Sequence, residues 1–340
     1  MKIYGENGYL DFPAIMAAVK VPFLFVIGGR GTGKTYGAEK WAIESGKKFI
    51  FLRRTQSQAD LIGKQEFSPF KSVCSDLGLE HRVQRASKYH SAVTFGGEEA
   101  PRAYIAALST FANIRGFDSS DIDLIVYDEF IPERHERPIK NEADAFFNVV
   151  ETVGRNRELQ GRAPVRVLCL ANSNDIANPY FMALGLVNRV QAMVKKGNIL
   201  YTDERRGLAV INCAHSPIGS AKAQTALYKL TAGGDFAEMA LENQFTGRDF
   251  RGGKSRDLRE YSPLIRAGEI MIYQHKGRRA FYVSAAMQGT AKREYSATEQ
   301  DLMKLRRDDD AMIGHYISGI VEFETPLCEL LFQRYFGLDK

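Results

Sequence analysis

The chain has 340 residues, of which 44% are hydrophobic and 26% are charged. This composition excludes a disordered tail, and the length favours two domains over one compact core. The net charge of +5 is mild, so it permits a nucleic-acid partner but does not by itself require one.

The cysteines and the N-terminal region carry no signal for export or for a zinc site. Four cysteines lie far apart in the sequence, without a CxxC pair or a histidine cluster. The most apolar early run, residues 13–29, is interrupted by Lys20 and Pro22. We therefore expect reduced thiols in a cytosolic protein, with neither a signal peptide nor a membrane span.

The first clear motif fits a phosphate-binding loop at each required position. Four β-favouring residues, 23–26, lead into Gly28-x-x-x-x-Gly33-Lys34-Thr35, and a helical pattern follows. Strand, loop and helix in this order are the context that the motif demands. Glycines let backbone N–H groups surround phosphates, while Lys34 is expected to reach the β- and γ-phosphates of ATP and Thr35 to bind Mg²⁺. The predicted nucleotide-binding residues of this loop are Gly28, Gly29, Arg30, Gly31, Thr32, Gly33, Lys34 and Thr35.

The next elements are typical of an α/β fold with a mainly parallel sheet, because short apolar runs alternate with helical patterns. The expected elements are a buried strand over residues 48–54, helical structure over 57–79, a hairpin over 82–97 that turns at Gly96 and Gly97, and a strand over 103–108.

A second part of the site is predicted at Asp128 and Glu129, which end the apolar run of residues 124–127. Sheets of this kind bind ligands at the carboxyl ends of their strands. Asp128 is expected to hold Mg²⁺ through water, and Glu129 to polarise the attacking water. The adjacent glutamate resembles the additional-strand, catalytic-glutamate division of P-loop ATPases, which implies hydrolysis rather than signalling.

Two further segments end in polar residues that suit a nucleotide site. A helical pattern over 143–158 contains Arg155 and Arg157 near its end. Such an arginine is either a finger acting on a neighbour's γ-phosphate, worth about 10³ to 10⁵ in rate, or a surface cation that complements the helix C-terminus. Asn172 follows an apolar strand over 165–170 and either senses the γ-phosphate or forms part of an ordinary turn.

These segments together resemble the DNA-packaging ATPases of phi29-type bacteriophages. The similarity is strong over about residues 23–190, weaker through residues 235–247, and beyond that rests on layout. It is carried by FLFVIGGRGTGKT (residues 23–35), IFLRR (50–54), IVYDEFIPE (125–133), VVETVGRNRE (149–158) and VLCLANSNDIANPYF (167–181).

The resemblance implies a motor that rings the portal of an empty capsid and drives double-stranded DNA inward. It implies a homopentamer in which Arg155 of one subunit reaches the neighbour's nucleotide, with Arg115 as a second trans-acting candidate. It also implies that the motor acts in the host cytoplasm while it is docked transiently on the procapsid. An RNA adaptor is a further implied partner, which the sequence cannot identify.

The predicted fold is an α/β P-loop ATPase followed by a smaller α+β domain that is RNase H-like and vestigial. The expected domains are the ATPase over residues 1–198, a linker subdomain over 199–234 and a C-terminal domain over 235–340. The related terminases carry a metal-dependent nuclease there, but Ser284 stands where its strand would need an aspartate. Residues 308–310, a run of aspartates, are expected to form a solvated charged turn.

A basic segment, residues 251–279, is the predicted DNA-binding region, with a solvated face as the alternative. It holds eight basic residues against three acidic ones, and Lys276, Arg278 and Arg279 are the DNA-binding candidates. Two other functions stay open from the sequence: a terminase with an active nuclease, and a module whose assembly is switched by ATP.

Overall fold

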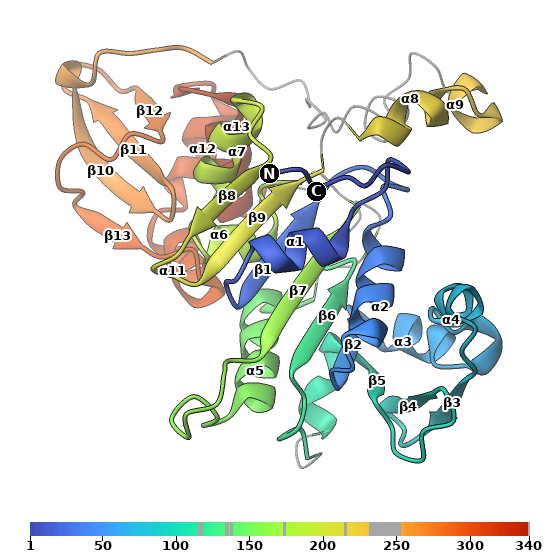
Figure 1. Cartoon of the computed structure of the whole chain (residues 1–340). Coiled ribbons are helices and arrows are strands. Elements are labelled where there is room, and N and C mark those ends of the chain that lie inside the picture. The colour runs from blue at the N-terminus through green and yellow to red at the C-terminus, as the bar shows by residue number, and fades with distance from the viewer. Residues whose placement is uncertain are drawn as a thin grey trace. The chain divides into compact units, whose positions relative to one another are not determined.

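A nine-stranded, mostly parallel sheet organises the larger part of the chain (Figure 1). The computed structural model describes residues 1–114, 118–132, 136, 139–172, 175–213, 216–230 and 253–338. The chain forms two compact units, Met1–Asn174 with Met193–Gln244 and Asp175–Ala192 with Phe245–Lys340. The domain boundaries expected at residues 198 and 234 stay predictions.

The large sheet has the strand order β3-β4-β5-β2-β6-β7-β1-β9-β8. Its six central strands are parallel, and antiparallel pairs close both edges. The strands are β1 (Phe23–Ile27), β2 (Phe49–Arg53), β3 (His81–Arg85), β4 (His90–Phe95), β5 (Ala103–Ala107), β6 (Leu124–Asp128), β7 (Arg166–Ala171), β8 (Leu200–Asp203) and β9 (Leu208–Asn212).

Register places the predicted site at one edge of this sheet. β7 lies between β6 and β1, with Leu170 opposite Asp128 and Ala171 opposite Ile27. The residues that follow these three strands therefore emerge side by side at the carboxyl edge, where parallel sheets bind ligands.

Helices cover both faces of the large sheet. Alternate strand residues such as Leu24 and Val26 share one buried cluster with α1 (Phe12–Ala18), α2 (Lys34–Glu44) and α4 (Lys71–Leu77). On the other face, α5 (Glu142–Gly154) packs through Phe146, whose ring centroid lies 5.5 Å from that of Tyr127. The remaining helices of this unit are α3 (Gln56–Ile62), η1 (Gln65–Phe67), η2 (Leu108–Ile114), α8 (Pro217–Ala223) and α9 (Ala226–Leu230).

The hairpin prediction is wrong in the place of its turn. β3 and β4 pair antiparallel, but residues 86–89 join them. Gly96 and Gly97 have φ values of 59° and 80°, and they turn the chain between β4 and β5 instead. Glycine tolerates this left-handed backbone, so Gly96 and Gly97 do mark a turn. That turn joins β4 to β5 and not β3 to β4.

A second, mixed sheet organises the smaller unit, in the order β13-β10-β11-β12-β14. The expected α/β class is confirmed at this level: a large, mostly parallel sheet and a smaller mixed one. The elements are α6 (Pro179–Ala183), α7 (Val187–Lys195), η3 (Leu258–Glu260), β10 (Tyr261–Ala267), β11 (Ile270–His275), β12 (Phe281–Ser284), β13 (Arg293–Tyr295), α11 (Glu299–Asp308), α12 (Ala311–Ile317), β14 (Val321–Phe323) and α13 (Pro326–Tyr335).

Residues 175–192 belong to the smaller unit although β8 and β9, which follow them, belong to the large sheet. The carboxylate of Glu269 accepts hydrogen bonds from the backbone N–H groups of Val187 and Asn188, at 2.8 and 3.0 Å. A carboxylate at a helix N-terminus satisfies free donors and complements the helix dipole. Asp175 is held by Arg334 at 2.5 Å. Among the described residues, no helix has both the length and the apolar character needed to cross a membrane.

Candidate nucleotide-binding site

The loop between β1 and α2 has a backbone that only glycine adopts easily. Gly28, Gly31 and Gly33 have φ values of 152°, 72° and 84°. A Cβ added at Gly28 would lie 2.6 Å from the Cβ of Cys213, so this position has no room for a side chain. The glycine spacing therefore reflects both left-handed conformation and close packing on the end of β9.

Lys34 lies inside this loop and is almost completely buried. Its ammonium donates to the carbonyls of Gly28 at 3.1 Å and Gly29 at 2.6 Å, and contacts the Thr32 hydroxyl at 3.3 Å. Burial, with the nearby positive charges of Lys222 and Arg30, lowers the pKa of Lys34 to about 8. The loop's own carbonyl groups thus hold the lysine.

Thr35 and Asp128 meet across the sheet edge and form the donor set for a cation. The Thr35 hydroxyl donates to the Asp128 carboxylate at 3.0 Å, and Asp128 is 5% exposed. Burial raises the pKa of Asp128, and Glu129 adds to that effect while Arg53 opposes it. A bound cation would relieve this penalty. One hydroxyl and one carboxylate fit Mg²⁺, which takes few protein ligands and completes its shell with water and phosphate oxygens.

Arg53, the last residue of β2, holds both acidic residues of the site and is the main feature that sequence reasoning missed. Its guanidinium donates to Asp128 at 2.8 Å and also pairs with Glu129. β2 runs parallel to β6 with Leu52 opposite Tyr127, so the next residue of each strand falls at the same level. The sequence shows the arginine pair that ends this strand, but it does not show which residues the arginines bind.

Glu129 has a strained backbone. Its φ is 54°, and among the described residues only two others that are not glycine have positive φ, Asn141 and Arg155. Such conformations cost of order 1–3 kcal/mol and cluster at functional sites. Two of these three positions are therefore residues that the sequence singled out independently.

The predicted arginines differ in their surroundings. Arg155 is exposed and follows the last residue of α5, with φ 44°. Arg157 is buried, and its guanidinium donates to the Ile122 carbonyl at 2.5 Å and to Asp123 at 2.6 Å. Arg157 thereby anchors the segment before β6. Arg115 lies outside the described residues.

Asn172 comes directly after β7, between the strands that carry the loop and the acidic pair. The structure thus gathers Lys34, Thr35, Asp128, Glu129 and Asn172 at one sheet edge.

The structure also brings Glu39 from α2 near Asp128. Glu39 is buried with one oxygen lacking a hydrogen-bond partner, and burial, aided by Asp128, raises its pKa well above the usual value.

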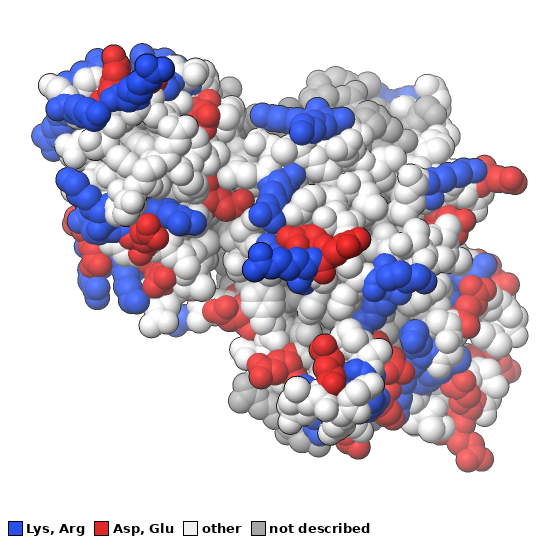
Figure 2. All heavy atoms as spheres, turned by 60° about the vertical axis from the view of Figure 1, so that its left-hand side comes forward, with Lys and Arg blue, Asp and Glu red and all other residues white. Residues whose placement is uncertain are grey.

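The DNA-binding candidates lie on the smaller unit, at the end of the sheet where β10 begins and β11 ends. Figure 2 shows Lys and Arg side chains gathered at the upper left of the view. Lys276, Arg278 and Arg279 are exposed, and no ion pair with a described carboxylate involves them. By contrast, Lys254 and Arg256 are paired with Glu322 at 3.1 and 2.7 Å.

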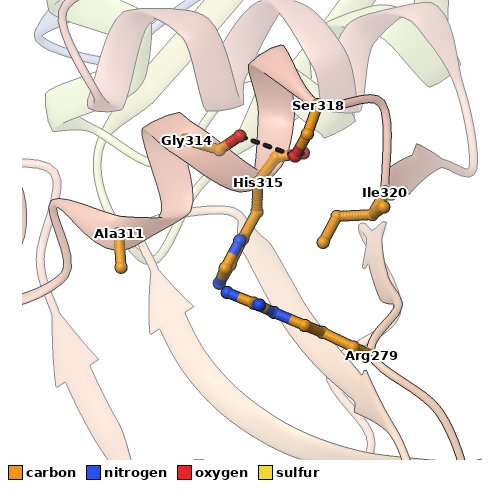
Figure 3. Close-up of a pocket in the computed structure, with 6 residues that line it drawn as sticks. All are labelled: Arg279, Ala311, Gly314, His315, Ser318 and Ile320. Atoms are coloured by element: carbon orange, nitrogen blue, oxygen red, sulfur yellow. Dashed lines mark hydrogen bonds between the residues drawn. The ribbon is translucent and has the colours of Figure 1, made fainter.

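One of these candidates, Arg279, lines an open pocket of about 640 Å³ (Figure 3). Arg279 and His315 point toward each other in it, and Ala311, Gly314, Ser318 and Ile320 complete its lining. The His315 ring stacks on Phe281 with centroids 4.7 Å apart. Burial and the charge of Arg279 lower the pKa of His315, so the pocket carries the arginine's charge at neutral pH.

Residues at the expected nuclease site bind other side chains of the smaller unit. Ser284 ends β12, which lies beside the central β11, and its hydroxyl donates to Glu324 at 2.7 Å. The expectation of a solvated turn at residues 308–310 is wrong for Asp309. This residue is buried, pairs with Arg293 and accepts a hydrogen bond from the Tyr295 hydroxyl at 3.0 Å. In the described part of the chain, no three His, Cys, Asp or Glu residues gather as a metal site.

The mostly parallel sheet and the glycine loop around a buried lysine together resemble the site of P-loop nucleotide-binding proteins. Residues 9–316 match the podovirus DNA encapsidation protein (Gp16) family, and the chain belongs to that family. The match confirms the resemblance to phi29-type packaging proteins, and the function of the chain is viral DNA packaging.

Individual relatives agree with this assignment. The chain is 29% identical to the DNA packaging protein of Bacillus phage PZA and 28% identical to that of Bacillus phage phi29, over 82% of the chain and 79% of each relative. A solved structure, the bacteriophage Phi-29 viral genome packaging motor assembly, shares its fold with a TM-score of 0.62 and 20% identity, covering 100% of both chains.

The lowered pKa of Lys34 predicts how nucleotide affinity depends on pH. Phosphate favours the charged lysine, so above pH 8 the loop must take up a proton as it binds ATP. The affinity of a fluorescent ATP analogue should then fall about tenfold per pH unit above this value. Lys34→Arg stays charged and should bind with little pH dependence. Titrations between about pH 7 and about pH 9.5 test this, and a flat profile for the unaltered protein would contradict it.

Proposed function

We propose that the chain hydrolyses ATP in the loop between β1 and α2 and uses the energy to drive double-stranded DNA into a preformed capsid. The observation that carries this proposal is the convergence of Lys34, Thr35, Asp128 and Glu129, of which the two acids are paired with Arg53. Phosphate-binding and water-activating groups thereby meet at one sheet edge.

The chemistry follows from the groups present. A water attacks the γ-phosphorus, Glu129 takes its proton, and the bond to the bridging oxygen breaks to release ADP and phosphate. Thr35 and Asp128 would hold Mg²⁺, which when bound neutralises charge on the phosphate oxygens. Arg53 pairs with one oxygen of the Glu129 carboxylate, Oε2, and the other oxygen takes the proton of the water.

Two finer assignments of fold belong to the same proposal. The larger unit is a P-loop ATPase of the additional-strand, catalytic-glutamate division, supported by the position of β7 between β6 and β1. The smaller unit is an RNase H-like domain that has lost its nuclease chemistry, supported by the engagement of Ser284 with Glu324. We assign it to binding DNA or the capsid.

We further propose a ring of identical subunits, a pentamer by analogy with its relatives, docked on the capsid portal in the host cytoplasm. Arg155 is the residue that completes a neighbour's site, because it is exposed beside the strained end of α5. A trans-acting role for Arg157 stays an untested prediction, and its burial weighs against it. Arg115 and an RNA adaptor remain predictions of the resemblance alone.

Glu129→Gln tests whether turnover drives packaging. The amide cannot accept the proton of the attacking water, so ATP binding should persist while steady-state hydrolysis falls about 10²- to 10⁴-fold and packaging stops. Glu44→Gln, an exposed change on α2, is the matched control. Packaging that continues without hydrolysis would instead support an ATP-switched module.

Mixed rings test the role of Arg155. Arg155→Ala and Lys34→Ala subunits should each be inactive alone but regain part of the ATPase activity when mixed. A Lys34→Ala subunit can then lend its arginine to the intact loop of its neighbour. Lys34→Ala mixed with Glu129→Gln is the control, because both residues serve the same subunit and no complete site can form. Absence of rescue at every ratio would reject the trans assignment.

The salt dependence of DNA binding tests the basic patch. A motor that moves any sequence should grip phosphates, whose neutralisation releases counterions. Changing Lys276, Arg278 and Arg279 together to Gln should lower the slope of log affinity against log salt by roughly two to three. A control triple of exposed lysines on the larger unit, Lys64, Lys71 and Lys88, should leave the slope unchanged. An unchanged slope in the first variant would remove the patch from DNA binding.

A further inference from the structure

A second lysine reaches the phosphate-binding loop from a part of the chain that no motif marks. Lys222 lies in α8, the helix that follows β9, and its ammonium donates to the backbone carbonyl of Arg30. A Cβ added at Gly31 would lie only 2.2 Å from this nitrogen. The absence of a side chain at Gly31 therefore allows Lys222 to lie directly against the loop.

The side chain of Lys222 is positioned on its other side as well. Its nitrogen lies 5.6 Å from the centroid of the Tyr228 ring, and Tyr228 is buried in the next helix, α9. Contact with an aromatic face favours a cation without neutralising it. The lysine is thus held between a ring and the loop, with its charge retained.

Lys222 and Lys34 bind the loop in the same way. Lys34 occupies the carbonyls of Gly28 and Gly29, and Lys222 occupies that of Arg30, the next along the chain. A lysine bound to a neutral carbonyl gains when it exchanges that oxygen for a phosphate oxygen, because hydrogen bonds between two charged groups are stronger. Lys222 gains from this exchange of a carbonyl oxygen for a phosphate oxygen for the same reason as Lys34 does.

The positive charges around the loop also favour an anionic ligand. Burial lowers the pKa of Lys222, and the adjacent charge of Arg30 lowers it further. Lys222 and Arg30 in turn lower the pKa of Lys34. This mutual repulsion costs free energy, and the attraction of phosphate groups that enter between the cations would offset it.

We propose that Lys222 binds the terminal phosphate of the nucleotide in its own subunit. The proposal rests on the proposed function, since it needs ATP in this loop. The second half of the loop, next to the N-terminus of α2, surrounds the inner phosphates. The first half, which contains Arg30, accordingly faces the γ-phosphate. Lys222 is then a residue by which the site distinguishes ATP from ADP.

The test compares fluorescent ATP and ADP analogues on the full-length protein. Lys222→Met keeps the apolar stem against Tyr228 but removes the charge. It should weaken binding of the ATP analogue about tenfold to a hundredfold and that of the ADP analogue by less than about threefold. Lys222→Arg should recover most of the ATP affinity. Lys229→Ala, an exposed lysine of α9, is the control and should change neither.

Three results would overturn the proposal: no loss for either nucleotide, equal losses for both, or failure of arginine to recover affinity. Equal losses would mean that Lys222 only supports the loop. Lys34→Ala, measured in parallel, keeps the two proposals apart. If Lys34→Ala loses ATP and Lys222→Met does not, the nucleotide site stands and the role of Lys222 falls. If the unaltered protein binds no ATP, the proposed function itself falls. A thermal unfolding midpoint confirms that each variant is folded, and Lys222→Gln replaces the methionine variant should it unfold.

Discussion

The ion pairs of Arg53 decide how the rest of the site is arranged. Asp128 and Glu129 are adjacent acids at a sheet edge, and the charge of Glu129 adds to the burial that raises the pKa of Asp128. Arg53 contacts both carboxylates and opposes this rise in the pKa of Asp128. The Mg²⁺ proposed for this site would add a second positive charge beside Asp128 and so share this role with Arg53.

The next residue, Arg54, anchors a helix on the opposite face of the sheet. Successive residues of a strand point to opposite faces, so Arg54 points away from the site when Arg53 points toward it. Arg54 is fully buried and binds Glu142, at the start of α5, through two hydrogen bonds of 2.6 and 3.0 Å. Removing one partner of a buried pair is costly because the other charge is left without compensation. The arginine pair thus joins the acidic residues to α5, the helix that Arg155 follows.

The parts that the sequence could predict are those encoded in contiguous residues. The glycine spacing from Gly28 to Gly33 reflects a local backbone requirement, and the apolar run before Asp128 reflects burial of one strand. The contacts that complete the site join distant segments. Arg53 meets Asp128 because two strands share a register, and Lys222 meets Arg30 across 192 positions. The turn in the first hairpin was misplaced for a related reason, because glycine signals a turn but does not choose which strands it joins.

The path of the chain through the two units constrains how the protein can be divided. Residues 175–192 contribute to the smaller unit before β8 and β9 return to the large sheet. β9 pairs with all five residues of β1, the strand that leads into the phosphate-binding loop. A fragment that ends near residue 198 would therefore leave β1 as an apolar edge strand that pairs only with β7, and such an exposed edge favours aggregation. It would also lack Lys222. Biochemistry on the isolated ATPase part should extend at least through α9, so that the nucleotide site is studied with its full complement of cations.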